Sequence, residues 1–321
     1  MMYLLLFISY LKNAQYAFTF LSEGLQIWFY QMIPALFPAI LWNHFVIQTG
    51  AAKKISKYVY PLFHKLFGVT YQGAFVILAG YICGFPLGAK VTSDLYQRKE
   101  LSQQEANYLL CFCNLIGPAY VFSFFLQKVS VQKPWLLLCL LYGIPFLYGH
   151  ILSKLSVLGS YSKETKQAIS AAEYTSEKTD FIQILDDGIQ QTIDALVILG
   201  GYMISFQLLR LFLLPLSDIL KAALAPFIEI NTGIQQVITI SSIANMEMEA
   251  APLLILGKAF LSSNYYPLTA VAFTGICCHA QACHYIRKAG LSCRKYLFHK
   301  IVLTGITFFF CLVCFCLHIS L

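Results

Sequence analysis

Charged residues are scarce in this sequence. Only 12% of its 321 residues are Asp, Glu, Lys or Arg, whereas 58% are hydrophobic. A soluble domain carries about 25% charged residues, so this composition indicates a chain that is surrounded by lipid. The formal net charge is +7, but no soluble basic domain is present to carry it, and we do not expect nucleic-acid binding.

The pattern of a cleavable signal peptide is also missing. The apolar tract at residues 2–20 lacks a basic beginning, because Lys12 lies in its middle, and no A-x-A-like cleavage site follows it. We therefore expect this tract to be a retained helix.

The eleven cysteines do not form the pattern of a disulfide framework. Most of them lie inside apolar tracts, where Cys behaves as a small hydrophobic residue. Disulfide scaffolds belong to oxidising compartments, so this usage instead suits a cytoplasmic membrane.

Long apolar tracts are what the sequence has in quantity. A helix needs ~20 residues to cross ~30 Å of hydrocarbon. Six tracts come close to this length, and they lie at residues 2–20, 27–48, 108–126, 134–152, 193–214 and 301–319. The short loops beside them are basic, for example around Lys54 and Lys57, which is the usual signal of membrane topology. The sequence therefore predicts an all-α, polytopic helical membrane protein.

A polar linker at residues 153–180 separates two transmembrane repeats, residues 1–152 and 181–321. Short matches recur in the same order in both repeats, and they pair residues 21–26 with 185–190, 80–83 with 274–277 and 101–102 with 291–292. Duplicated halves are typical of secondary transporters. Three crossings in the first repeat, at 27–48, 108–126 and 134–152, would invert the second repeat, provided that the region around 74–98 is re-entrant.

The first repeat contains a broken helix. An apolar arm at residues 74–83 is too short to cross a bilayer, and Gly84, Pro86 and Gly88 interrupt it before a polar helix begins at Ala89. Backbone groups freed at membrane depth are tolerated only where protein or a water-filled cavity satisfies them. The positive end of the second helix, together with Lys90, would favour an anion. The alternative is a plain loop between two helices.

The second repeat contains a similar break. A short arm begins at Tyr266, breaks at Gly275 and continues as a polar helix through His279 and Gln281. In this pairing His279 takes the position that Phe85 has in the first repeat. We expect His279 and Gln281 to be polar groups at the break.

The same helix carries a cluster of Cys and His residues that resembles a metal site, namely Cys277, Cys278, His279, Cys283 and His284. A zinc site needs four ligands that converge tetrahedrally, usually from separated pairs. One short helix cannot present them in this way, and no second ligand pair is evident. We therefore expect no metal and no cofactor, and we interpret the cysteines as small packing residues.

Two further interruptions contain polar residues. Asn114 precedes Gly117 and Pro118 inside a predicted membrane helix, and a proline frees the carbonyl four residues before it, here that of Asn114. The alternative is a packing kink.

Glu229 lies in an apolar segment, and Asn231, Thr232 and Gly233 follow it. An ionisable residue in such a segment is a functional candidate that could take a proton or neutralise a cation. The alternative is an interfacial residue at a helix end, which is how we interpret Glu247 and Glu249.

The order WFYQMIPALFP, GFPLGAK, LSQQEANYLLCFCNLIGP, IEINTG and TGICCHAQ followed by YLFHKI resembles the sporulation integral membrane proteins of the YlbJ type. Those proteins carry the nucleoside-recognition, or Gate, domain. The resemblance implies a nucleoside-transporter-like fold in a bacterial cell membrane or a spore-envelope membrane. It also implies movement of a small anionic metabolite, with dipicolinate as the substrate class.

These features together predict a transporter or permease in which the two breaks face each other around one site. Backbone N–H groups, Lys90, Asn114 and His279 would hold carboxylates, and Glu229 would be the coupling or gating group. The expected substrate-binding residues are Gly84, Pro86, Gly88, Ala89, Lys90, Asn114, Gly117, Pro118, Glu229, Asn231, Thr232, Gly233, His279 and Gln281.

The expected partners are a small anionic solute and the lipid bilayer, and a homo-oligomer is compatible with the sequence. The alternatives are a transporter of nucleosides or other small solutes and a membrane scaffold that does not transport. An intramembrane enzyme is not expected, because no nucleophile–base pair stands out.

Overall fold

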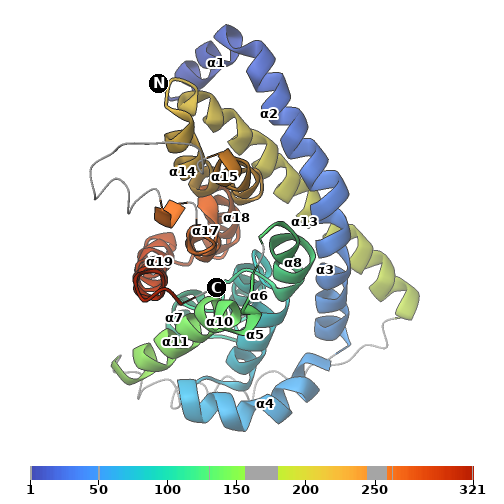
Figure 1. Ribbon diagram of the computed structural model, residues 1–321. Coiled ribbons are helices and arrows are strands. Elements are labelled where there is room, and N and C mark those ends of the chain that lie inside the picture. Colours follow the sequence, from blue (N-terminus) through green and yellow to red (C-terminus); the bar gives the residue numbers. More distant parts are fainter. Residues whose placement is uncertain are drawn as a thin grey trace.

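The computed structural model describes residues 2–49, 51–129, 131–155, 180–243, 259–261, 263–319 and 321. Within these ranges the chain forms helices and their connections, with no strand, as the composition predicts. Figure 1 shows long helices around the outside and shorter, interrupted helices near the centre.

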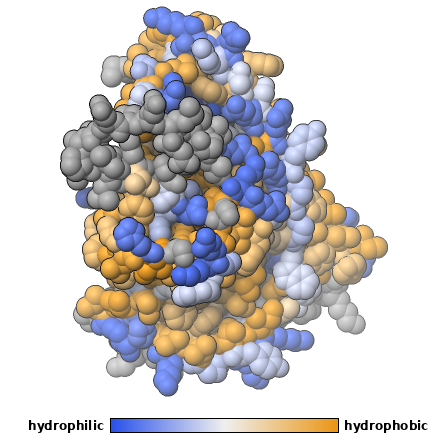
Figure 2. Space-filling model, viewed as in Figure 1, coloured by the Kyte–Doolittle hydropathy of each residue, from blue (hydrophilic) through white to orange (hydrophobic). Residues whose placement is uncertain are grey.

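Among the described residues, four helices are long and apolar enough to cross a membrane, namely Ala14–Val46, Pro134–Leu155, Phe181–Leu213 and Cys293–Cys316. Only 22–39% of the most apolar window of each is buried within the protein. Figure 2 accordingly shows broad hydrophobic areas on the surface, interrupted by groups of hydrophilic residues. An apolar surface of this extent is suited to lipid rather than to water.

The first and third of these helices are composite. The first joins α2 (Ala14–Ile27), the π-helical turn η1 (Trp28–Met32) and α3 (Ile33–Gln48). The third joins α13 (Phe181–Gln207) to the 3₁₀ turn η5 (Leu208–Leu213).

The second and fourth lie in the later part of each repeat. The second joins α10 (Pro134–Leu138), the π-helical turn η3 (Cys139–Gly143) and α11 (Ile144–Leu155). The fourth is a single helix, α19 (Cys293–Cys316).

The N-terminal tract differs from its prediction as one retained helix over residues 2–20. Helix α1 (Met2–Lys12) ends at Lys12, and α2 starts at Ala14 and runs into the first long helix. At the interruption the Asn13 side-chain amide donates to the Ser9 carbonyl at 3.1 Å. Such local bonds compete with the backbone ladder of a helix, and α1 alone is too short to cross a bilayer.

The predicted membrane helix at residues 108–126 is also not one helix. Helix α7 (Gln103–Leu110) ends before a non-helical stretch at residues 111–117, and α8 (Pro118–Tyr120) then begins. Proline disfavours helical geometry in the residue before it, and Gly117 is extended with φ −77° and ψ 148°. The count of three crossings therefore loses one of its three helices, and the inversion of the second repeat stays a prediction.

The chain continues from α8 through a π-helical turn, η2 (Val121–Phe125), and a short helix, α9 (Leu126–Lys128). Earlier, α4 (Ala51–Phe67) meets the next helix at a bend of 94°. Figure 1 shows α4 lying across the lower end of the other helices.

Both predicted broken helices are present. Helix α5 (Tyr71–Ile82) is followed by α6 (Leu87–Gln97), with Gly84 at φ +75° between them. Helix α17 (Tyr265–Phe273) is followed by α18 (Gly275–Lys288), with Thr274 at φ +71° between them. Positive φ values reverse the local backbone, which explains why each pair cannot continue as one straight helix.

The turns after the two broken helices have the same local structure. Glu100 donates its N–H to the Leu95 carbonyl, and Leu291 donates to the Ile286 carbonyl, both at 2.9 Å. The capping residues that follow, Ser102 before α7 and Ser292 before α19, each accept a backbone N–H three residues later.

The turn bonds are 191 residues apart and the capping serines are 190 residues apart, so the two turns do not fix one register between the predicted repeats. The pairing of His279 with Phe85 stays a prediction.

Helices from the N-terminal and C-terminal parts of the chain are interleaved in space. Helix α13 packs against α2 and α3, and Figure 1 shows these three helices running together along one side. The Trp28 indole N–H donates to the Leu196 carbonyl at 2.9 Å. Helices α6 and α18, which follow the two breaks, also pack against each other, and the Gln97 amide donates to the Lys288 carbonyl at 2.9 Å.

Candidate functional site

The break after α5 lies directly against the break after α7. A Cβ atom added to Gly84 would lie 2.2 Å from the Gly117 Cα atom. Added to Gly80 or Gly88, it would lie 2.0 or 2.3 Å from the Cys113 carbonyl oxygen. Only glycine permits two backbones to approach so closely, so the predicted residues Gly84, Gly88 and Gly117 bring the two interruptions together.

Asn114 links the two breaks to α19. Its Oδ1 atom accepts the Ala89 N–H at 3.2 Å, and its amide donates to the Tyr296 hydroxyl at 3.0 Å. The Ala89 N–H belongs to the first turn of α6, where backbone donors have no partner within the helix. The predicted pair Ala89 and Asn114 is therefore in contact, next to Pro86 and Pro118 at the adjoining helix starts.

His279 reaches the same network from α18. Its Nδ1 atom lies 2.8 Å from the Tyr296 hydroxyl. Its ring meets the Phe85 ring edge to face, with the centroids 6.4 Å apart. The structure therefore brings His279 and the first break together, with Tyr296 as a link that the sequence analysis did not identify.

Lys300 is one turn further along α19 from Tyr296, and only 4% of it is exposed. Its ammonium donates to the Asn114 backbone carbonyl at 3.3 Å. This is the carbonyl that Pro118 was predicted to free. The sequence analysis did not assign Lys300, although a lysine within an apolar tract is itself a signal.

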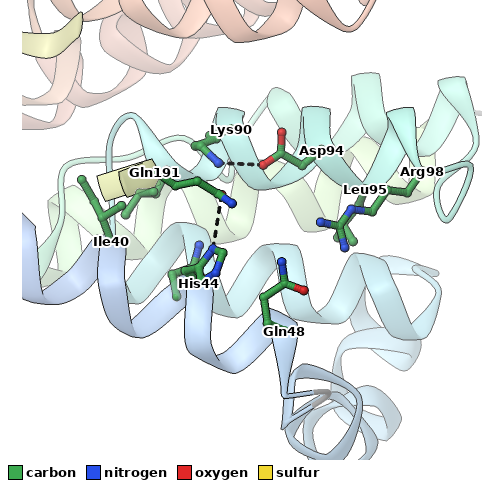
Figure 3. Close-up of a pocket in the computed structure, with 10 residues that line it drawn as sticks. Ile40, His44, Gln48, Lys90, Asp94, Leu95, Arg98 and Gln191 are labelled. Carbon is green, nitrogen blue, oxygen red and sulfur yellow. Dashed lines mark hydrogen bonds and ion pairs between the residues drawn. The ribbon is translucent and has the colours of Figure 1, made fainter. Parts of the chain in front are cut away.

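Lys90 is not part of this network. Its ammonium pairs with Asp94 at 2.9 Å and faces a different cavity between α3, α6 and α13. Figure 3 shows Lys90 and Asp94 opposite His44 and Gln191. The Nδ1 atom of His44 lies 3.2 Å from the Oε1 atom of Gln191. Ala89 contacts Asn114 through its backbone N–H, which points along the helix axis, whereas the Lys90 side chain projects sideways from α6 toward α3.

Glu229 lies at a second junction, between α14 (Asp218–Ile228) and α15 (Ile230–Ile243). It is completely buried. Its carboxylate accepts the backbone N–H groups of Asn231 at 3.1 Å and Thr232 at 2.9 Å. These are donors of the first turn of α15, so Glu229 has the geometry of a helix cap and not of a residue facing lipid.

Side chains complete the surroundings of Glu229. The Asn231 amide, the Thr232 hydroxyl and the Gln207 amide donate to its carboxylate at 2.7, 2.9 and 3.2 Å. Gln207 in turn accepts from Arg210 at 2.9 Å, and Arg210 pairs with Glu23 at 2.7 Å. A chain of polar contacts therefore connects the buried carboxylate to the half-exposed Glu23 on α2.

The break after α17 lies against this junction. A Cβ atom on Gly233 would lie 2.3 Å from the Pro226 Cα atom, and one on Gly275 would lie 3.1 Å from the Pro226 carbonyl oxygen. The buried Gln281 donates to the Cys277 sulfur at 3.4 Å. Glu247 and Glu249 lie outside the residues that the structure describes.

The predicted site residues thus fall into three groups. Ala89, Asn114 and His279 share one network, and Gly84, Gly88 and Gly117 allow it to form. Lys90 faces a separate cavity. Glu229, Asn231, Thr232 and Gly233 form the second junction, which the α17–α18 break adjoins.

The Cys and His cluster does not converge on one point. No group of three or more potential metal ligands forms within the part of the chain that the structure describes. His279 contacts Tyr296, and Cys283 offers its carbonyl to the Cys293 thiol at 3.6 Å. Cys277 is buried in the hydrophobic core.

We expect a Cys277→Ala, Cys278→Ala and Cys283→Ala triple variant to have the same zinc content as the unmodified protein. The thiols pack as small apolar groups, so the expected change is a modest loss of thermal stability. Elemental analysis of both purified proteins measures this. Stoichiometric zinc in the unmodified protein that disappears in the triple variant would contradict the prediction.

Comparison with known proteins gives one clear similarity. The chain is 26% identical over 245 residues to the sporulation integral membrane protein YlbJ of Bacillus subtilis (strain 168). The aligned residues cover 68% of this chain but 57% of that protein, so the chain spans little more than half of its relative's length. No family model and no solved structure matches the chain. The four apolar helices and this similarity together identify the chain as an integral membrane protein.

Proposed function

We propose that this protein is a transporter or permease for a small anionic metabolite, with the solute bound where the broken helices meet. The supporting observation is the network in which Asn114 joins Ala89 of α6 to Tyr296 of α19, which in turn contacts His279 of α18. Interrupted helices in a membrane protein are tolerated where they are buried in protein or line a cavity. In transporters such interruptions form the substrate sites.

We place this transport in sporulation because the chain is similar to YlbJ, which is a sporulation integral membrane protein. The resemblance of the motifs gives the substrate class, a dicarboxylate such as dipicolinate, and a nucleoside-transporter-like arrangement of Gate type. The matching turns after α6 and α18 support the duplication that this arrangement requires. Inverted orientation of the two repeats remains part of the proposal.

The test is uptake of radiolabelled carboxylates by sealed vesicles that contain the purified protein. We expect uptake above that of protein-free vesicles, and we expect Asn114→Leu to reduce it at least tenfold per folded molecule. Leucine is similar in size but provides neither the acceptor for Ala89 nor the donor for Tyr296. Losing one buried hydrogen bond costs roughly 1–3 kcal/mol, and ~1.4 kcal/mol corresponds to a factor of ten.

The control is Gln104→Leu, because Gln104 is exposed near the start of α7. Size-exclusion chromatography verifies that each variant is folded. Uptake of nucleosides but not of carboxylates would favour the alternative substrate class. No uptake of any solute would favour the alternative of a membrane scaffold.

A further inference from the structure

Lys300 is a buried cation without a matching anion in the described parts of the chain. Its ammonium contacts the Asn114 carbonyl, and none of the ion pairs of the described residues includes it. An ammonium has three donors, and a carbonyl oxygen at 3.3 Å satisfies one of them. A lysine at membrane depth is costly unless it is paired or faces water, and such residues mark ion or substrate pathways.

A small cavity adjoins this ammonium. Lys300 lines it together with apolar side chains and Thr307, and the lining residues are Leu115, Ile116, Leu141, Pro145, Val271, Ala272 and Leu303. The Thr307 hydroxyl already donates to the Leu303 carbonyl at 3.0 Å. The cavity therefore offers one cation among walls that are mostly apolar.

The cavity lies where the parts of the proposed site meet. Leu115 and Ile116 belong to the break after α7, and Val271 and Ala272 belong to the last turn of α17, just before the second break. Lys300 is therefore the charged group that the two interruptions share. Lys90 differs, because Asp94 already neutralises it in another cavity.

We infer that Lys300 is the residue that binds the carboxylate of the transported anion, and that the walls of the cavity select carboxylates with a compact apolar body. This inference rests on the proposed function and specifies its site. A carboxylate would provide the ammonium with charge-assisted hydrogen bonds. The apolar remainder of the ligand would lie against the side chains of Ile116, Val271 and Leu303.

The experiment compares two probes of the same shape, benzoate and the uncharged benzamide, by their binding to the purified protein in detergent. We expect the unmodified protein to bind benzoate more tightly than benzamide, by roughly ten- to hundredfold, because a hydrogen bond to a charged group is at stake. Lys300→Met should remove this preference. Lys300→Arg should retain part of it, because the charge remains while the geometry changes.

Two further variants keep the test decisive. Lys300→Gln retains an N–H donor near the Asn114 carbonyl without the charge, so it serves if Lys300→Met does not fold. Lys221→Met removes a lysine that pairs with Asp218 on the surface of α14, and it should leave the preference unchanged. The inference is overturned if the unmodified protein binds both probes equally, or if folded Lys300→Met and Lys300→Gln still prefer benzoate.

Vesicle uptake measured on the same preparations separates this inference from the proposed function. Charge-selective binding that depends on Lys300, without any uptake, contradicts transport and leaves the binding site supported. Uptake whose apparent affinity for carboxylates is equal in Lys300→Met contradicts the inference and leaves transport supported.

Discussion

Gly84→Ala is expected to prevent the breaks after α5 and α7 from packing against each other, and to lower the free energy of unfolding by roughly 2–5 kcal/mol. Gly84 has φ +75°, where an alanine is strained by roughly 1–2 kcal/mol. The added methyl group would also lie 2.2 Å from Gly117 backbone atoms. The Gly117 backbone cannot move aside as a side chain can, so overpacking adds roughly 1–3 kcal/mol to the loss of stability. Folded domains have about 5–15 kcal/mol of stability in total, so this substitution should remove a large part of it.

The chain provides matched controls for this substitution. Gly68 has φ +69°, but a Cβ atom there would meet nothing within 4 Å, so Gly68→Ala tests the backbone strain alone. Gly305 has neither feature, and Gly305→Ala should be neutral. Thermal unfolding in detergent and the monodisperse fraction measure the three variants. Equal stability of Gly84→Ala and Gly68→Ala would show that the close contact with Gly117 is not formed.

Glu229→Ala is expected to destabilise the protein by roughly 3–5 kcal/mol, because it leaves a set of buried donors without their acceptor. Backbone N–H groups of Asn231 and Thr232 and three side-chain donors contact this carboxylate. No water can replace it without access to a completely buried position. The expected result is a strong decrease in the melting temperature measured in detergent.

Glu229→Gln separates the structural role from the coupling role that the sequence suggested. Glutamine keeps the shape, but its amide nitrogen cannot accept, so one side of the cap is lost and we expect roughly 1–3 kcal/mol. Lys221→Gln, which alters an exposed ion pair, serves as the control. If Glu229→Gln is as stable as the unmodified protein but transports without ion dependence, the residue is a coupling group. If Glu229→Ala is equally stable, the cap itself is not formed.

Local patterns in the sequence predicted the helices and their interruptions. Apolar tract lengths indicated the long helices, and glycine with proline around Gly84 and Pro86 indicated where a helix had to stop. The two tracts that differ, residues 2–20 and 108–126, have the hydropathy of membrane helices. Pro118 indicates an interruption in the second tract, but the pattern does not distinguish a kink from the end of a helix. Short polar or proline-containing interruptions, such as Asn13 and Pro118, have little effect on hydropathy but end a helix.

Contacts between distant residues could not be predicted in the same way. Asn114 reaches Tyr296 and Lys300 across 182 and 186 residues, and no local pattern encodes which side chains will meet. The direction of the Lys90 side chain could not be predicted either. The neighbouring residue Ala89 contacts the network through its backbone N–H, whereas the Lys90 side chain faces another cavity. Glu229 was identified as an ionisable residue in an apolar segment, but its partner Gln207 lies on another helix that sequence spacing does not relate to it.

The interleaving of N-terminal and C-terminal helices has a consequence for the order of assembly during synthesis. The indole of Trp28 finds its acceptor, the Leu196 carbonyl, 168 residues later in the chain. At roughly 5–20 residues per second, the ribosome needs about 10–30 s to supply that partner. The N-terminal helices must therefore wait in the membrane with an open lateral face, and α13 closes that face when it arrives. Early insertion and final packing are thus separate events in the biogenesis of this protein.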